Sequence, residues 1–148
     1  MLSKLKALFS GKKELPKNLT VEHEQFILKE GSDGQREQLA ARKDARPEVL
    51  YYLAEDKSPE VRREIARNPA TPPQADALLQ NDEDAEVRAE LARKIGRLVP
   101  DMGAEEKKAL REQAIKILEG LAEDQLPKVR AIIAEEIKCS VSVPKALV

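Results

Sequence analysis

The sequence LAEDKSPEVRREIA at residues 53–66 returns as LQNDEDAEVRAELA at residues 79–92 and as LAEDQLPKVRAIIA at residues 121–134. Each copy begins with Leu, has Asp three residues later, and continues through a Val-Arg pair to aliphatic residues and Ala. The second copy starts 26 residues after the first, and the third starts 42 residues after the second. Residues 36–40 match the same pattern one period before the first copy. Such a period is the signature of stacked repeats, in which each unit buries its apolar face against its neighbours.

Each repeat is predicted to contain two helices. A proline in the first turn marks the leading helix, at Pro47 and Pro73, where the missing N–H costs no hydrogen bond. The second helix begins after a capping residue, Ser58 or Asp84, and carries apolar residues at i, i+4 spacing. Alternation at period two, which is typical of strands, never lasts. The sequence therefore predicts an all-α protein, a right-handed α-solenoid of about four helix pairs. The pairs are expected at about residues 19–43, 47–67, 72–98 and 104–138.

The segment before the repeats, residues 1–18, is basic at its start. Leu5, Leu8 and Phe9 have near-helical spacing among lysines, and no acidic residue precedes Glu14. A weak membrane-surface helix has this pattern, and so has a short helix that docks on the end of the repeats or on a partner. Because the helix would be only two turns long, we favour the docked helix. The segment lacks the apolar stretch of a secretory signal, and we therefore expect a cytoplasmic protein.

The repeat domain is expected to span residues 19–148, with residues 142–148 as the start of a further repeat. Either the gene ends there or the chain is a fragment of a longer array, and we expect the fragment. A solenoid end without a cap exposes its core face. The apolar residues Val129, Ile133 and Ile137 would then be only partly covered, and weak self-association through this end is expected.

Composition excludes several classes of function. Lys and Arg number 26 and Asp and Glu number 27, which leaves a net charge of -1 and argues against wholesale coating of nucleic acid. Aromatic residues make up 3% with no Trp, too few for a base-stacking platform. His23 and Cys139 are the only residues of their types, so no disulfide within the chain, multi-Cys zinc site or His-based triad is available. We expect no metal, no cofactor and no enzymatic activity.

The Asp followed by Pro-x-Val-Arg, at Asp56 and residues 59–62, resembles the repeats of HEAT-like α-solenoids. The turn NPATPP at residues 68–73 is similar to short-period relatives, the leucine-rich repeat variant proteins and an uncharacterised HEAT-like family of alphaproteobacteria. The likeness covers about residue 36 to the C-terminus. It implies a bacterial interaction scaffold and says little else about function. Repeat-variant proteins can carry an iron–sulfur module built from several Cys, which the lone Cys139 does not match.

The repeat carries an arginine and an aspartate that are expected to hold neighbouring units together. On a helical wheel, Arg62 lies about 100° from Val61, beside the apolar stripe. From there it can bond a helix end or the Asp of an adjacent unit. This structural ladder is predicted at Arg62, Arg88 and Arg130 with Asp56, Asp82 and Asp124. These arginines should be more buried than Arg63, Arg67 and Arg93.

A second group of residues is a candidate for partner binding. Arg63 lies about 200° from Val61 on the helical wheel, and we expect its side chain to point to solvent. The same is expected of Arg67, Arg93 and Arg97, which together with Arg63 form a stripe of arginines. Stacked second helices would align these side chains on the inner wall, although Glu64 and Glu90 dilute their charge and a solvated mixed-charge face remains equally possible. Tyr51 beside Leu50 is a candidate partner anchor, with burial of the pair against the N-terminal helices equally expected, and Tyr52 is expected in the core. The candidate residues are Arg63, Arg67, Arg93, Arg97 and Tyr51.

Two functions remain, with a third that is weaker. The favoured function is a non-enzymatic scaffold for another protein, whose surface would be acidic. The alternative is a binder of nucleic acid or another phosphate backbone through the basic inner face, which the shortage of aromatics disfavours. An enzyme using Glu64 and Glu90 is the third, and nothing in the sequence polarises these carboxylates.

Overall fold

The computed structural model describes residues 2–9, 14–99 and 105–138, and in these residues it is all-helical, with no strand. A short α1 precedes four consecutive helix pairs. The helices are α1 (Leu2–Phe9), α2 (Val21–Glu30), α3 (Asp33–Ala40), α4 (Pro47–Leu53), α5 (Pro59–Arg67), α6 (Pro73–Leu79), α7 (Ala85–Leu98), α8 (Lys108–Ala122) and α9 (Pro127–Lys138), with a 3₁₀ turn, η2 (Glu105–Lys107), before α8.

Local sequence explains where these helices begin. Thr20 and Ser32 cap α2 and α3 with capping boxes, in which the side chain at the third helical position bonds back to the cap. Asp84 caps α7 by accepting hydrogen bonds from the N–H groups of Glu86 and Val87. Proline occupies the first position of α4, α5 and α6, where its fixed backbone suits a helix start.

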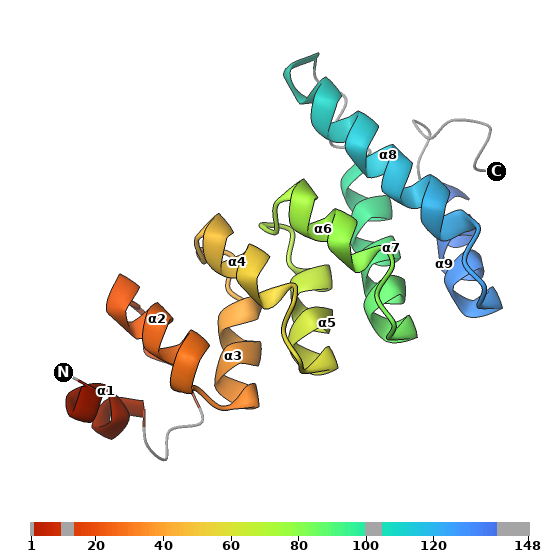
Figure 1. The fold of residues 1–148 in the computed structure, drawn as a ribbon. Coiled ribbons are helices and arrows are strands. Elements are labelled where there is room, and N and C mark those ends of the chain that lie inside the picture. The colour runs from red at the N-terminus through yellow and green to blue at the C-terminus, as the bar shows by residue number, and fades with distance from the viewer. Residues whose placement is uncertain (1, 10–13, 100–104, 139–148) are drawn as a thin grey trace.

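The pairs form two rows that run along the molecule (Figure 1). We call α2, α4, α6 and α8 the first row, and α3, α5, α7 and α9 the second row. Each second-row helix packs extensively on the next, whereas neighbours in the first row touch much less. The second row is therefore the tightly packed side of the molecule.

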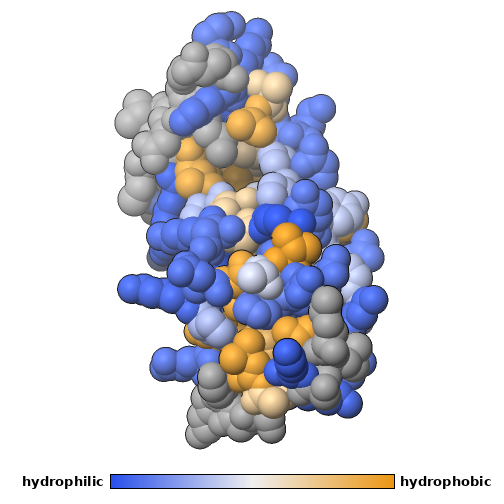
Figure 2. Space-filling view, turned by 90° about the vertical axis from the view of Figure 1, so that its left-hand side faces the viewer, coloured by the Kyte–Doolittle hydropathy of each residue, from blue (hydrophilic) through white to orange (hydrophobic). Residues whose placement is uncertain are grey.

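The core lies between the two rows. Leu53, Leu79 and Leu121 of the repeat are at most 1% exposed, and the repeat valines are fully buried. The surface at the N-terminal end is hydrophilic with separate apolar patches (Figure 2). No helix in the described part of the chain is long and apolar enough to cross a membrane.

Helix α1 docks on the first repeat. Phe9 is buried against Phe26, with ring centroids 5.6 Å apart, and its carbonyl accepts a hydrogen bond from Gln35. Leu5 and Leu8 also pack on the core. The apolar face that a membrane-surface helix would need is thus occupied by the protein itself.

The expectations for α4 and α9 need correction. Tyr52 is 59% exposed, because the buried stripe of α4 consists of Val49, Leu50 and Leu53. For the pair Leu50 and Tyr51 the sequence left an exposed anchor and burial equally open; Tyr51 is 41% exposed, whereas Leu50 is fully buried. Its counterpart Asp76 suggested exposure, but Asp76 is itself a buried polar residue.

The prediction that the apolar face of α9 is only partly covered is also wrong for two of its residues. Val129 and Ile133 are at most 2% exposed, in a helix that packs on both α7 and α8. The side chain of Ile137 lies outside what the structure describes. Cys139 and the predicted further repeat at residues 142–148 also lie outside the described residues.

Candidate partner-binding site

A ladder of arginine–aspartate pairs joins successive helix pairs. In every rung, Nε of the arginine donates to Oδ2 of the aspartate in the following repeat, at 2.6–2.8 Å. The same guanidinium donates from Nη2 to Oδ1 at 3.3 Å, which makes the contact bidentate. Its Nη1 bonds a backbone carbonyl in the turn of its own repeat. The rungs are Arg36–Asp56, Arg62–Asp82 and Arg88–Asp124.

Each aspartate of the ladder also organises the turn before its second helix. Oδ1 of Asp56, Asp82 and Asp124 accepts the N–H two residues later, at 2.9 Å in all three turns. Burial tends to raise the pKa of Asp124, but the hydrogen bonds from Arg88 and from the N–H of Leu126, together with the charges of Arg88 and Arg130, outweigh burial, and the pKa lies below its ordinary value. One carboxylate therefore fixes both the turn and the contact between repeats.

The last predicted member of the ladder does not form a rung. Arg62 is 8% exposed, and the side chain of Arg88 is 15% exposed, as expected, but Arg130 is exposed. Arg130 donates to the carbonyls of Asp124 and Gln125, and no second-row helix follows α9 in the described residues. The prediction that Arg130 is more buried than the stripe arginines is therefore wrong.

A second ladder, not anticipated from the sequence, caps the carboxyl ends of preceding segments. Arg42, Asn68 and Lys94 stand 26 residues apart, and each donates to carbonyls about one repeat earlier. Asn68 Nδ2 bonds the carbonyls of Ala40 and Arg42 at 2.8 Å, and Lys94 Nζ bonds that of Asn68 at 3.1 Å. The three residue types differ, so only the spacing could have revealed this ladder.

Lys94 forms a buried ion pair with Asp76 of α6. Burial raises the pKa of Asp76 to about 6, although the nearby ammonium opposes the rise. Burial likewise lowers the pKa of Lys94. Because the ammonium is enclosed by the carboxylate and by backbone carbonyls, it fixes α6 and α7 to the end of α5.

The predicted stripe of arginines is largely paired with carboxylates. Arg63 binds Asp84 at 3.1 Å, away from the others. Arg67 bonds Glu64 at 2.7 Å and Glu90 at 3.1 Å. These contacts raise the pKa of Arg67, chiefly through the hydrogen bond with Glu90. Arg93 also bonds Glu90, at 2.8 Å. Glu90 of α7 therefore joins Arg67 of α5 to Arg93 of its own helix. This surface is a mixed-charge network.

Three of the candidate residues, Arg67, Arg93 and Arg97, meet in one pocket of about 400 Å³ at the carboxyl ends of α5 and α7. We call it the α5–α7 pocket. Arg97 is exposed, and the side chain of Arg67 is 51% exposed. The complete lining is Arg67, Pro69, Glu90, Arg93, Lys94, Arg97 and Leu98.

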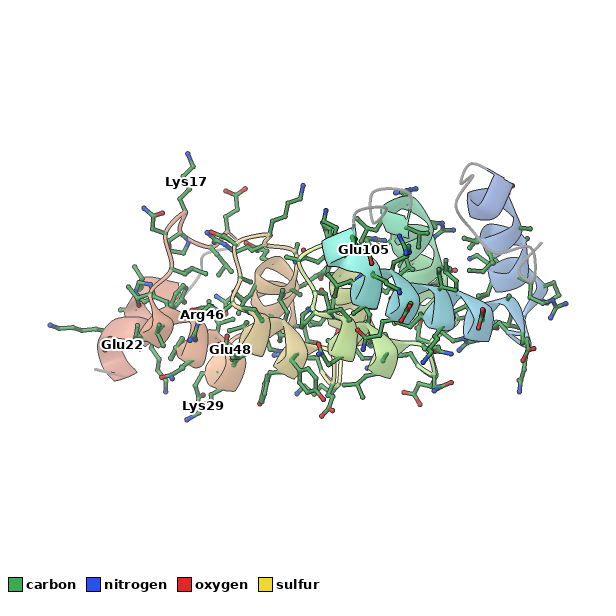
Figure 3. The ribbon with its side chains drawn as sticks, turned by 90° about the horizontal axis from the view of Figure 1, so that it is seen from above. Lys17, Glu22, Lys29, Arg46, Glu48 and Glu105 are labelled. Atoms are coloured by element: carbon green, nitrogen blue, oxygen red, sulfur yellow. The ribbon has the colours of Figure 1, made fainter. Side chains whose placement is uncertain are left out.

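The remaining candidates lie elsewhere. Arg63 is not part of the pocket lining, and Tyr51 belongs to the first row, on α4, where it is 41% exposed. Arg46, labelled in Figure 3, precedes α4. It bonds the buried Glu24 of α2 at 3.0 Å and thus serves packing.

The α5–α7 pocket combines guanidinium donors with the apolar surface of Leu98 and Pro69. Glu64 and Glu90 already accept hydrogen bonds from arginines. No cluster of His, Cys, Asp or Glu suited to a metal ion occurs among the residues that the structure describes.

Comparisons of the chain with family models, with curated proteins and with solved structures found no match. The likeness to HEAT-like repeats therefore rests on the sequence pattern alone.

Proposed function

We propose that the chain is a HEAT-like, right-handed α-solenoid that works without catalysis, as a scaffold binding another protein along its second row. The observation that carries this proposal is the α5–α7 pocket, where three of the five candidate residues meet at the carboxyl ends of two adjacent second-row helices. Pockets with an apolar wall and a few convergent polar groups are the usual places for ligands.

The division of charged residues supports the same function. The buried arginines of the first ladder bond aspartates and turn carbonyls, and the second ladder bonds the ends of preceding segments. These groups are committed to holding the repeats together. Three partly exposed arginines of α5 and α7, Arg63, Arg67 and Arg93, bond carboxylates near the surface, where pairs contribute little stability. Those surface arginines are the ones available to a partner.

A phosphate-backbone binder is less well supported. Nucleic-acid affinity depends on neutralising successive phosphates with cations. Along this surface Asp84, Glu64 and Glu90 already neutralise arginines, and they would repel a polyanion. A folded protein segment, which can match a mixed-charge surface, fits better.

The experiment is site-specific photo-crosslinking of the full chain in its source cell. A benzophenone amino acid replaces Pro69 or Leu98 at the pocket, and Gln74 or Glu48 on the first row as controls. We expect a discrete adduct from the two pocket positions alone, resistant to nuclease and sensitive to protease. Nuclease-sensitive adducts, equal labelling from all four positions, or labelling from the first row alone would overturn the proposal.

A further inference from the structure

Helix α9 exposes two positions that are buried or largely buried in the other second-row helices. They carry the ladder arginine and the alanine four residues after it. The counterparts in α3, α5 and α7 are Arg36 and Ala40, Arg62 and Ala66, and Arg88 and Ala92. In α9, Arg130 and Ala134 are exposed. We call their surface the α9 face, and it lies at the end of the second row in the described part of the chain (Figure 1).

The core side of the same helix is a different surface and is already covered. Val129 and Ile133 are at most 2% exposed, in a helix that packs on α7 and α8. Leu126, whose carbonyl accepts the N–H of Arg130, is 42% exposed and adds apolar area beside the α9 face. This face is therefore a further contact surface on a helix whose own core is complete.

Arg130 is held in the orientation of a half-formed rung. Its Nη1 donates to the carbonyl of Asp124 at 2.6 Å. The equivalent bond from Arg62 to the carbonyl of Asp56 is 2.7 Å long. In the complete rungs, Nε and Nη2 bind the aspartate of the following repeat, whereas no described residue accepts a hydrogen bond from these two atoms of Arg130. A guanidinium oriented in advance loses less entropy when a carboxylate binds it.

The complete rungs specify what complements the α9 face. In each of them, the aspartate stands in the turn of a helical hairpin, three residues before the first residue of the second helix. Its two carboxylate oxygens meet Nε and Nη2 of the preceding arginine. The small alanine side chain leaves room for the second helix of that hairpin to approach. The complement is therefore a helical hairpin with an aspartate in its turn.

A different protein fits this requirement better than the same chain does. Residues 139–148 contain no Asp or Glu. A second copy would have to offer its first repeat, because its later ladder aspartates are already paired. In that repeat, however, Gln35 bonds the carbonyl of Phe9, and Gln38 accepts the N–H of Leu15. Helix α1 and the segment after it thus occupy that end of the second row.

We propose that the α9 face docks a helical hairpin of a different protein whose turn carries an aspartate. The carboxylate binds Nε and Nη2 of Arg130, and the second helix of the hairpin lies along Ala134, as one more repeat would. This surface is separate from the α5–α7 pocket, and the inference does not depend on a partner binding there.

The probe is a synthetic peptide of residues 73–98, the hairpin that places Asp82 on Arg62 in the intact chain. It is titrated into the uniformly ¹⁵N-labelled full chain, and amide and arginine Nε shifts are followed. We expect shifts confined to α9 and the turn before it, with Nε of Arg130 among them. Asp82→Asn in the peptide keeps an acceptor for the turn and should weaken binding about tenfold, since a charge-assisted hydrogen bond is worth about that factor.

Variants of the chain separate recognition from folding. Arg130→Gln should weaken the peptide about tenfold, whereas Lys29→Gln, which removes an exposed cation of α2, should leave its affinity unchanged. Because short isolated helices are marginal in water, a second form joins the same hairpin to the full chain after Val148 through a Gly-Ser linker. Its thermal midpoint should exceed that of its Asp82→Asn form, with the change made in the added hairpin, and Arg130→Gln should abolish the difference.

Three results would overturn the inference. They are equal midpoints of the two tethered forms while Arg130 is intact, peptide-induced shifts located away from α9, and a dimer of the full chain in light scattering that Arg130→Gln abolishes. The dimer would assign the α9 face to a second copy. Crosslinking from Pro69 tests the scaffold proposal independently, because that residue lies in the α5–α7 pocket.

Discussion

Replacing Arg62 by Ala tests whether the first ladder holds the repeats together. The side chain is 8% exposed and makes a bidentate contact with Asp82, at 2.8 and 3.3 Å, and a 2.7 Å bond to the carbonyl of Asp56. Removing one partner of a buried pair typically costs about 3–5 kcal/mol. Asp82 keeps the N–H of Asp84, which lowers the loss. We therefore expect a loss of about 3 kcal/mol.

The assay is urea unfolding followed by circular dichroism, with Arg67→Ala as the matched control. Arg67 also bonds two carboxylates, but its side chain is 51% exposed, so we expect a loss below about 1 kcal/mol. The double variant Arg62→Ala/Asp82→Ala should lose less than the sum of the two single variants, by about 1 kcal/mol or more. A loss for Arg62→Ala no greater than for the control, or additive losses in the double variant, would refute the ladder's role.

Three further outcomes are expected. The pKa of Asp76 is raised from 3.8 to about 6, so its contribution to stability is fully present below pH 3.8 and is lost as the pH rises through 6. Asp76→Asn removes this loss, so the stability of the variant relative to the unmodified protein should rise by about 2 kcal/mol between pH 4 and 7, in urea titrations at each pH; a flat difference contradicts the burial argument. Asn68→Ala should cost about 2 kcal/mol, because it leaves the carbonyls of Ala40 and Arg42 without their donor, and the exposed Asn18→Ala should cost almost nothing in the same assay. Gly120→Ala should raise the thermal midpoint, since the added methyl meets only the movable side chain of Gln80, whereas Gly31→Ala should lower it, since its methyl would lie 2.5 Å from the backbone oxygen of Ile27. Equal changes at the two glycines would show that these contacts do not decide the result.

The first ladder could be predicted because its residues are the conspicuous ones in each repeat. The position of Arg62 beside the apolar stripe predicted a bond to a helix end or to the aspartate of an adjacent unit, and the structure shows the aspartate of the following repeat. The position of Arg36 one period earlier carried the same signal. The prediction for Arg130 was wrong because this arginine can pair only with the aspartate of a following repeat. A helical wheel describes one helix and does not show whether a neighbouring helix is present.

The second ladder and the buried pair were beyond pattern analysis. Three different side chains, those of Arg42, Asn68 and Lys94, donate the equivalent hydrogen bonds to backbone carbonyls about one repeat earlier. The residue type at this position therefore does not repeat in the sequence. A buried Asp76 is recognisable only once Lys94 is brought to it by tertiary packing. In the candidate site, the sequence indicated exposed arginines, but not that three of them border a pocket.

The central claim is that the exposed arginines of the α5–α7 pocket bind a partner while the buried ones hold the fold. The most direct measurement is the amount of the partner captured through Pro69 that co-purifies with the triple variant Arg67→Gln/Arg93→Gln/Arg97→Gln, with urea stability measured on the same sample. We expect the partner to be lost while stability stays within about 1 kcal/mol of the unmodified protein. Undiminished capture by the triple variant at unchanged stability would contradict it.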